Sequence, residues 1–287
     1  MIAPQEGVDT SESADIDEVA AEEESKMLLQ HVVCLAFLVR KRILNAPVTP
    51  SSAAKIQFRA GFVLDVKGQW YWLTAGHVIE DIEKHGLQHS TQIAEEFKLI
   101  DQFGTTVIED HFHYIPFAFE NAWRFFEHDD ESGMDYGIVA LGELEKRALQ
   151  KNNITPITPK VWQNPSPLRM PFLFVFGFPS DQIEPRYAEN TEGFSVIAKP
   201  TACGVSMTLE KVQDPKPCRI YAKLGENWPE GELDGFSGGP AFAVTKSGYQ
   251  IIALQSGWDR PNRVAFVCPL QIVGPRILKA IRNRSKT

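Results

Sequence analysis

The start of this 287-residue chain lacks both parts of a secretory signal, a basic stretch and a following apolar run. The apolar residues 27–39 form a short run that Gln30 and His31 interrupt, so they fit a β-strand better than a membrane span. Four cysteines are present, none of them in a C-x-x-C pair, and they form no disulfide framework. We therefore expect four free thiols, no membrane span and a location in the reducing cytoplasm.

Signals for bound cofactors are also scarce. The glycines form no pattern that would cradle a phosphate, which leaves nucleotide binding without support, and we expect no cofactor. His111 and His113 would lie on one face of a strand and are a possible metal pair. Because nothing nearby supplies a third ligand, no metal site is predicted.

Charge is concentrated at the N-terminus. Residues 1–26 contain nine acidic side chains and one lysine, whereas the rest of the chain has 28 acidic and 28 basic side chains. A segment this charged, without aromatic residues, cannot bury enough surface to fold by itself, so we expect a disordered acidic tail. The neutral body argues against nucleic acid as a partner, although residues 271–284 read as a helix with a basic end.

The remainder reads as short strands separated by turn signals, which is typical of antiparallel barrels. In the first half we expect strands at residues 28–39, 56–65, 70–73, 94–101 and 105–118, a short helix at 78–85, and a strand that begins at Asp135. A proline-rich crossing is expected at 145–170. In the second half, strands are expected at 171–178, 194–207, 218–224, 239–244, 249–254 and 263–269.

The most informative motif is Gly-Phe-Ser-Gly-Gly-Pro at residues 235–240. Glycines on both sides of Ser237 allow the backbone to turn sharply and to present the hydroxyl in a cleft. The same turn can direct the amides of Gly235 and Ser237 to one point, where they would stabilise an oxyanion. The motif is therefore typical of the nucleophile loop of a serine protease, although a glycine-rich hairpin is an alternative reading.

Two upstream segments favour the protease reading. An aromatic strand ends in Thr-Ala-Gly and is followed at once by His77, and Asp135 directly precedes a strand of small and apolar residues. The order His, Asp, Ser occurs in chymotrypsin-like enzymes and differs from that of subtilisins and α/β-hydrolases. From about residue 28 to residue 281, the chain resembles the trypsin-like serine peptidases, in a compact form without the PDZ extension of HtrA-type relatives.

The resemblance implies an all-β fold of two antiparallel six-stranded β-barrels with a C-terminal helix. The tail would span residues 1–26, the first barrel residues 27–160 and the second barrel residues 161–287. His77 would act as the base, Asp135 would orient it, and Ser237 would be the nucleophile. The competing aspartates in the same region are Asp101, Asp110, Asp129 and Asp130. Asp135 is preferred because a buried strand follows it, whereas residues 127–131 read as a solvated loop.

The resemblance also places a specificity pocket beside the nucleophile loop, lined by Gly231, Glu232, Gln255, Ser256 and Gly257. Acidic residues before the loop could favour Lys or Arg at the cleaved position, or they could face water.

Trypsin-like zymogens pair a new N-terminal amine with an aspartate before the serine, but this chain has Phe236 there. We therefore expect Phe236 to pack into the second barrel instead.

These features predict a serine endopeptidase that cleaves a protein or peptide partner. A protease fold that has lost catalysis and only binds peptides is the alternative, and the presence of His77, Asp135 and Ser237 argues against it. An esterase could use the same three residues, although their order makes this reading weaker.

Overall fold

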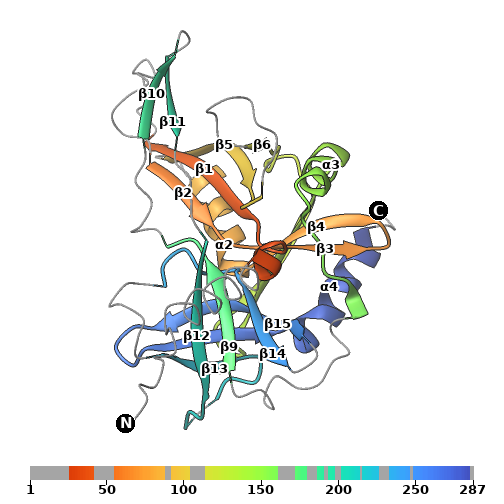
Figure 1. Ribbon diagram of the computed structural model, residues 1–287, viewed down its shortest axis with the longest axis vertical. Coiled ribbons are helices and arrows are strands. Elements are labelled where there is room, and N and C mark those ends of the chain that lie inside the picture. Colours follow the sequence, from red (N-terminus) through yellow and green to blue (C-terminus); the bar gives the residue numbers. More distant parts are fainter. Residues whose placement is uncertain are drawn as a thin grey trace, which may run out of the picture.

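The computed structural model describes residues 26–41, 55–87, 92–103, 114–160, 172–179, 186–190, 193–197, 202–213, 215–225, 233–245 and 248–284. These residues form antiparallel sheets, a closed six-stranded barrel and a C-terminal helix (Figure 1). The all-β expectation is confirmed at this level. The expected acidic tail and the pair His111 and His113 lie outside the described residues.

The first half contains two four-stranded sheets. One has the order β2–β1–β5–β6, with β1 at Cys34–Lys41, β2 at Lys55–Arg59, β5 at Gln92–Ile100 and β6 at Ile115–Pro116. The other has the order β3–β4–β8–β7, with β3 at Phe62–Val66, β4 at Gln69–Thr74, β8 at Met134–Ala140 and β7 at Arg124–Asp129.

A closed six-stranded barrel is not confirmed for this half. The expected strand 56–65 is broken at Ala60 and Gly61, so β2 and β3 belong to different sheets. The carbonyl of Ala60 accepts a hydrogen bond from the hydroxyl of Thr74 at 2.8 Å, and that of Gly61 accepts one from the amide of Val33 at 2.9 Å. These two bonds hold the break in place and tie the sheets together.

Two further elements of this half differ from the sequence reading. Residues 127–129 were expected in a solvated loop but belong to β7, which pairs with the buried strand β8 and keeps its charged side chains partly exposed. The helix α3, at Glu143–Lys151, occupies part of the expected irregular crossing. It has acidic residues in its first turn and a lysine in its last, which suits the helix dipole, and it buries Leu149.

The second half contains the closed barrel, with the strand order β12–β13–β16–β15–β14–β9. Its strands are β9 (Phe172–Gly177), β12 (Cys203–Glu210), β13 (Ile220–Leu224), β14 (Pro240–Thr245), β15 (Gly248–Asp259) and β16 (Val264–Pro269). The expected strand 194–207 is in fact two elements. Residues 193–197 form β11, which pairs with β10 (Arg186–Asn190) in a hairpin that extends away from the barrel in Figure 1.

The helix α4, at Leu270–Arg284, joins the two halves. It packs on β15 and β16 of the barrel and on β8 of the first half. Its Arg276 donates a hydrogen bond to Glu127 at 3.0 Å. At the other end of the chain, Gln30 and His31 both lie within hydrogen-bonding distance of the Tyr249 hydroxyl on β15, at 2.7 and 2.8 Å.

All four cysteines are free, as the sequence predicts. Among the residues that the structure describes, no helix has the length and apolar character needed to cross a membrane.

Candidate active site

His77 and Asp135 form a tightly bonded pair in the first half. The Nδ1 atom of His77 lies 2.8 Å from Oδ2 of Asp135, and the backbone amide of His77 donates to Oδ1 at 2.9 Å. The Asp135 side chain is 1% exposed, whereas the His77 side chain is 26% exposed. The carboxylate therefore holds one edge of the imidazole from inside the protein and leaves the other edge available.

The local sequence explains how this pair is placed. The buried strand β4 ends at Thr74, and the helix α2 (Gly76–Asp81) begins two residues later, so His77 stands at a strand-to-helix corner. A Cβ atom at Gly76 would lie 2.3 Å from the carbonyl oxygen of Glu127, so only glycine allows α2 to approach β7 this closely. Asp135 lies on β8, which pairs with both β4 and β7.

The surroundings favour the charged form of the imidazole. Burial alone would lower the pKa of His77, but the hydrogen bond and the negative charge of Asp135, with a smaller contribution from Asp81, raise it above its ordinary value. Asp135 can therefore stabilise an imidazolium at this position, as a general base requires after it has accepted a proton.

The loop that carries Ser237 packs directly on the strand end that precedes His77. Gly238 adopts a φ of 90°, and a Cβ atom there would lie 2.0 Å from Oγ1 of Thr74 and 2.9 Å from the amide nitrogen of Ala75. Ser237 is half-buried, and in the described part of the chain no hydrogen bond joins its hydroxyl to His77. Such bonds are often long before a substrate binds.

Hydrogen bonding within this loop leaves two amides unused. Phe236 donates to Leu233 at 3.0 Å, Gly238 to Gln255 at 2.7 Å, and Gly239 to Phe236 at 2.8 Å. Within the described residues, the amides of Gly235 and Ser237 donate no hydrogen bond. Two donors that flank one residue are thus available to an acceptor that arrives from outside.

Phe236 lies in the second barrel, as the sequence predicts. Its side chain is fully buried in the barrel core, and a Cβ atom at Gly177 would lie 2.4 Å from its ring. The loop is therefore held by apolar packing of Phe236 and by backbone hydrogen bonds.

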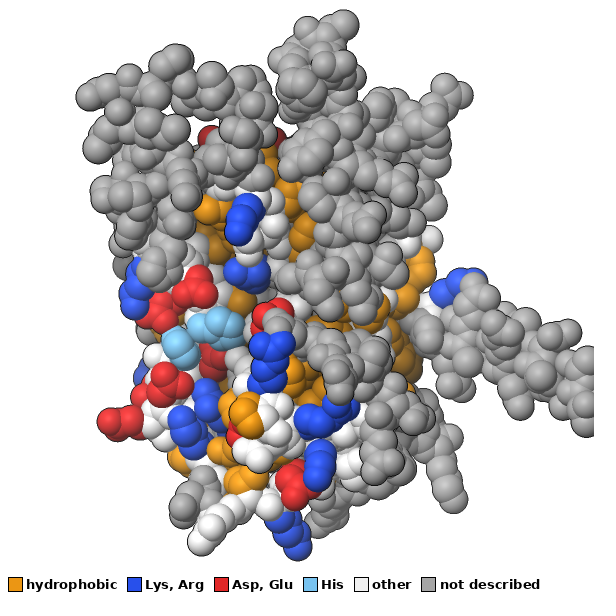
Figure 2. Space-filling view, turned by 90° about the vertical axis from the view of Figure 1, so that its left-hand side faces the viewer, with side chains coloured by type: hydrophobic (Ala, Val, Ile, Leu, Met, Phe, Trp, Pro, Cys, Tyr) orange, Lys and Arg blue, Asp and Glu red, His pale blue; other side chains and the backbone are white. Residues whose placement is uncertain are grey.

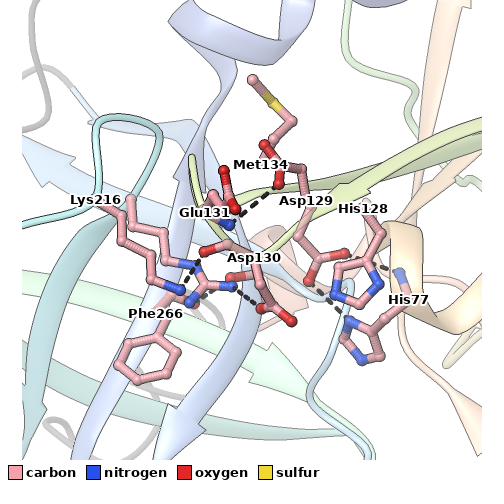
Figure 3. Close-up of polar contacts among 12 residues, drawn as sticks. His77, His128, Asp129, Asp130, Glu131, Met134, Lys216 and Phe266 are labelled. Atoms are coloured by element: carbon pink, nitrogen blue, oxygen red, sulfur yellow. Dashed lines mark hydrogen bonds and ion pairs between the residues drawn. The ribbon is translucent and has the colours of Figure 1, made fainter.

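The competing aspartates have other partners. Asp101 accepts a hydrogen bond from Asn152 at 2.7 Å, and Asp129 caps its own turn by bonding Ser132. Asp130 lies 3.5 Å from Arg219 of the second half. In Figure 3, the Lys216 side chain of the second half donates a hydrogen bond to the backbone carbonyl of Asp130, and His77 lies on the opposite side of Asp130. Asp110 lies outside the described residues.

The expected specificity pocket is described only in part. Gly231 and Glu232 lie outside the described residues, whereas Gln255, Ser256 and Gly257 are on β15. Gln255 is fully buried, and its backbone bonds Gly238 and Gly239 beside Ser237. Its side-chain nitrogen donates to the carbonyl of Gly257 at 2.9 Å, but its buried oxygen Oε1 has no hydrogen-bond partner among the described residues.

A second imidazole–carboxylate pair lies beside the first, and the sequence reading missed it. His128 on β7 lies directly opposite Asp135, and its Nδ1 atom is 2.6 Å from Glu80 of α2. The ring centroids of His77 and His128 are 5.8 Å apart, and the two rings lie side by side in Figure 3. The position of Glu80 three residues after His77 on a helix was the available signal.

No described group of three or more His, Cys, Asp or Glu side chains is arranged to hold a metal ion.

No family model and no curated protein matches this chain. Among solved structures, a thermostable serine protease from an extremophilic microorganism is 14% identical over 84% of this chain and 91% of its own, with a TM-score of 0.44. A TM-score this low does not establish a shared fold.

Proposed function

We propose that this protein is a serine endopeptidase that cleaves a protein partner through His77, Asp135 and Ser237. The observation that carries this proposal is the His77–Asp135 pair, in which a buried carboxylate fixes Nδ1 of a partly exposed imidazole. The packing of Gly238 on Thr74 supports it, because this contact brings the neighbouring Ser237 toward that imidazole.

The chemistry follows from these contacts. With Nδ1 engaged by Asp135, the Nε2 atom of His77 is the basic nitrogen that accepts the proton of the Ser237 hydroxyl. The serine oxygen then attacks the peptide carbonyl, and His77 passes the proton to the departing amine, which leaves an acyl-enzyme that water hydrolyses. Asp135 stabilises the imidazolium in both halves of the reaction.

The negative charge that develops on the carbonyl oxygen needs donors that are already in place. The unused amides of Gly235 and Ser237 serve this role, and the hydrogen bonds of Phe236, Gly238 and Gly239 fix the loop around them. Losing one such donor in a protease reduces kcat by about 10²–10³-fold.

Gln255, Ser256 and Gly257, together with Gly231 and Glu232, form the proposed pocket for the side chain of the cleaved residue. The buried Oε1 atom of Gln255 offers an acceptor, since an amide oxygen without a partner favours a ligand that donates a hydrogen bond. Lys, Arg and Gln side chains provide such donors.

The competing function is peptide binding without cleavage. The bonded pair His77–Asp135 and the two unused amides favour catalysis, because a binding module needs neither.

Covalent labelling with a fluorophosphonate probe tests the proposal. The wild-type protein should be labelled, and Ser237→Ala should abolish labelling and reduce kcat on peptides by about 10⁶-fold. The exposed Ser206 on β12 provides the matched control, since Ser206→Ala should be labelled like the wild type. Labelling that persists in Ser237→Ala refutes the nucleophile, and hydrolysis of esters without cleavage of peptides refutes the endopeptidase.

A further inference from the structure

Arg59, the last residue of β2, lies at the meeting point of the two halves. The carbonyl of the next residue, Ala60, accepts the hydrogen bond from Thr74, and a Cβ atom at Gly238 would lie 2.4 Å from that carbonyl oxygen. Arg59 is thus one residue from the contact that holds the Ser237 loop. The sequence offered no signal for this position, since Arg59 is one of 29 basic residues.

The guanidinium of Arg59 has few partners of its own. It donates one hydrogen bond, from Nη1 to the carbonyl of Phe58 at 3.0 Å, and lies 6.0 Å from the centre of the Phe37 ring. In the part of the chain that the structure describes, no carboxylate is within ion-pairing distance of it. Most of its five N–H donors are therefore available to another group.

Arg59 is half-buried, and its charge is felt at the site. Burial lowers the pKa of its guanidinium, although the charges of Asp81 and Asp234 oppose this effect. The positive charge of Arg59 also counteracts, in part, the rise in the pKa of His77. Asp81 and Asp234 are exposed to water, which screens them, so a carboxylate that bonds the guanidinium directly would interact more strongly.

One face of the molecule carries histidine side chains with acidic and basic side chains next to them (Figure 2). The side chains of His77 and His128 are partly exposed, at 26% and 25%. The face around the pair is therefore mixed in charge, and a single unpaired cation there can select a ligand of opposite sign.

The proton transfer indicates which part of the substrate passes near His77. His77 delivers a proton to the departing amine, so the leaving chain passes on the His77 side of Ser237. Arg59 belongs to the same half as His77, whereas the unused amides of Gly235 and Ser237 belong to the other half. Arg59 thus belongs to the half of the protein on the leaving side of the substrate.

We propose that Arg59 binds an acidic side chain of the substrate one or two residues after the scissile bond. The enzyme then prefers peptides that carry Asp or Glu at these positions. This inference rests on the proposed peptidase function. A guanidinium is suited to the role because it bonds a carboxylate through two parallel N–H groups.

The test uses internally quenched peptides with one cleavage site, identified first from a peptide library. Glu is compared with its isosteric neutral partner Gln at each position from three residues before to three residues after the bond. The wild-type protein should show a Glu-to-Gln ratio in kcat/KM of about tenfold or more at the first or second position after the bond. In Arg59→Gln this ratio should fall toward one. The Arg59→Glu variant should instead cleave a peptide with Lys at that position faster than the same peptide with Gln.

The controls separate charge at this position from net charge and from loss of the fold. Arg147→Gln makes the same charge change on the exposed face of α3 and should keep the wild-type ratio. Arg59→Lys keeps the charge and should retain part of the preference. Fluorophosphonate labelling of each variant reports whether the Ser237 site is assembled, without any contribution from the leaving chain.

The outcomes are distinguishable from failure of the proposed function. A wild-type protein that is not labelled and cleaves nothing refutes the peptidase. A labelled, active protein with a Glu-to-Gln ratio near one, or with a preference confined to positions before the bond, overturns the assignment of Arg59. Retention of the ratio in a labelled Arg59→Gln variant overturns it as well.

Discussion

The contact of Gly238 with the strand end before His77 is the feature on which assembly of the site depends. Gly238→Ala tests it, because a Cβ atom there would lie 2.0 Å from Oγ1 of Thr74 and 2.4 Å from the carbonyl of Ala60. Gly68→Ala is the matched control. Gly68 has a similar φ of 85°, against 90° at Gly238, but apart from its chain neighbours no atom of the described residues lies within 4 Å of its added Cβ.

The expected losses of stability distinguish backbone strain, which both variants share, from steric overlap, which only Gly238→Ala introduces. In both variants, a left-handed backbone conformation with a Cβ atom costs about 1–2 kcal/mol. Gly238→Ala also disrupts the hydrogen bond from Thr74 to Ala60, worth about 1 kcal/mol, and adds overpacking of about 1–3 kcal/mol. The free energy of unfolding should therefore fall by about 2–4 kcal/mol more in Gly238→Ala than in the control.

Urea unfolding followed by tryptophan fluorescence measures this difference, and the rate of fluorophosphonate labelling measures its effect on Ser237. Displacement of the nucleophile by about 1 Å can reduce its reactivity about 10²-fold, so Gly238→Ala should label slowly even where it is folded. Gly68→Ala should label at the wild-type rate. Equal stability losses in the two variants, with normal labelling of both, would show that the loop does not pack on Thr74.

Three further predictions concern the imidazole, the N-terminus and the thiols. Because Asp135 raises the pKa of His77, the stability that the pair contributes is complete below the ordinary histidine pKa of 6.5 and is lost as the pH rises through the raised value. Asp135→Asn should lower the pKa of the His77 ring, followed by NMR, and reduce kcat by about 10⁴-fold; an unchanged ring pKa would contradict the pairing. A shortened chain that starts at Met27 keeps the hydrogen bond from Tyr249 to the Met27 carbonyl and should cleave a peptide at least as fast as the full chain, whereas rescue only by a specific new N-terminal residue would show that the terminus inserts. Four thiols should titrate in the unfolded, non-reduced protein, and in the native protein Cys268, whose pKa burial raises to about 12, should react more slowly than the half-buried cysteines; fewer than four would reveal a disulfide.

The sequence by itself determined the features that depend on local backbone chemistry. Glycines on both sides of Ser237 allow a tight turn, and the end of an aromatic strand at Thr-Ala-Gly indicated that His77 follows the strand directly. The position of Phe236 in the barrel core was also predicted from the sequence, because Phe236 offers no carboxylate to an N-terminal amine and is stabilised by apolar packing instead. The short strands and turn signals of the second half predicted the closed barrel, although β11 and β12 were expected as one strand.

Tertiary structure decided which distant residues meet. The local pattern favoured Asp135 over Asp129, but the contact of Asp135 with His77 requires β8 to pair with β4, two segments about 65 residues apart in the sequence. The same holds for the break at Ala60, which is stabilised by hydrogen bonds to Thr74 and by the approach of Gly238, and which divides the first half into two sheets. His128 lies beside His77, and the charge of Arg59 acts on His77, only through such long-range contacts, because a charged side chain on a short strand is locally indistinguishable from a solvated one.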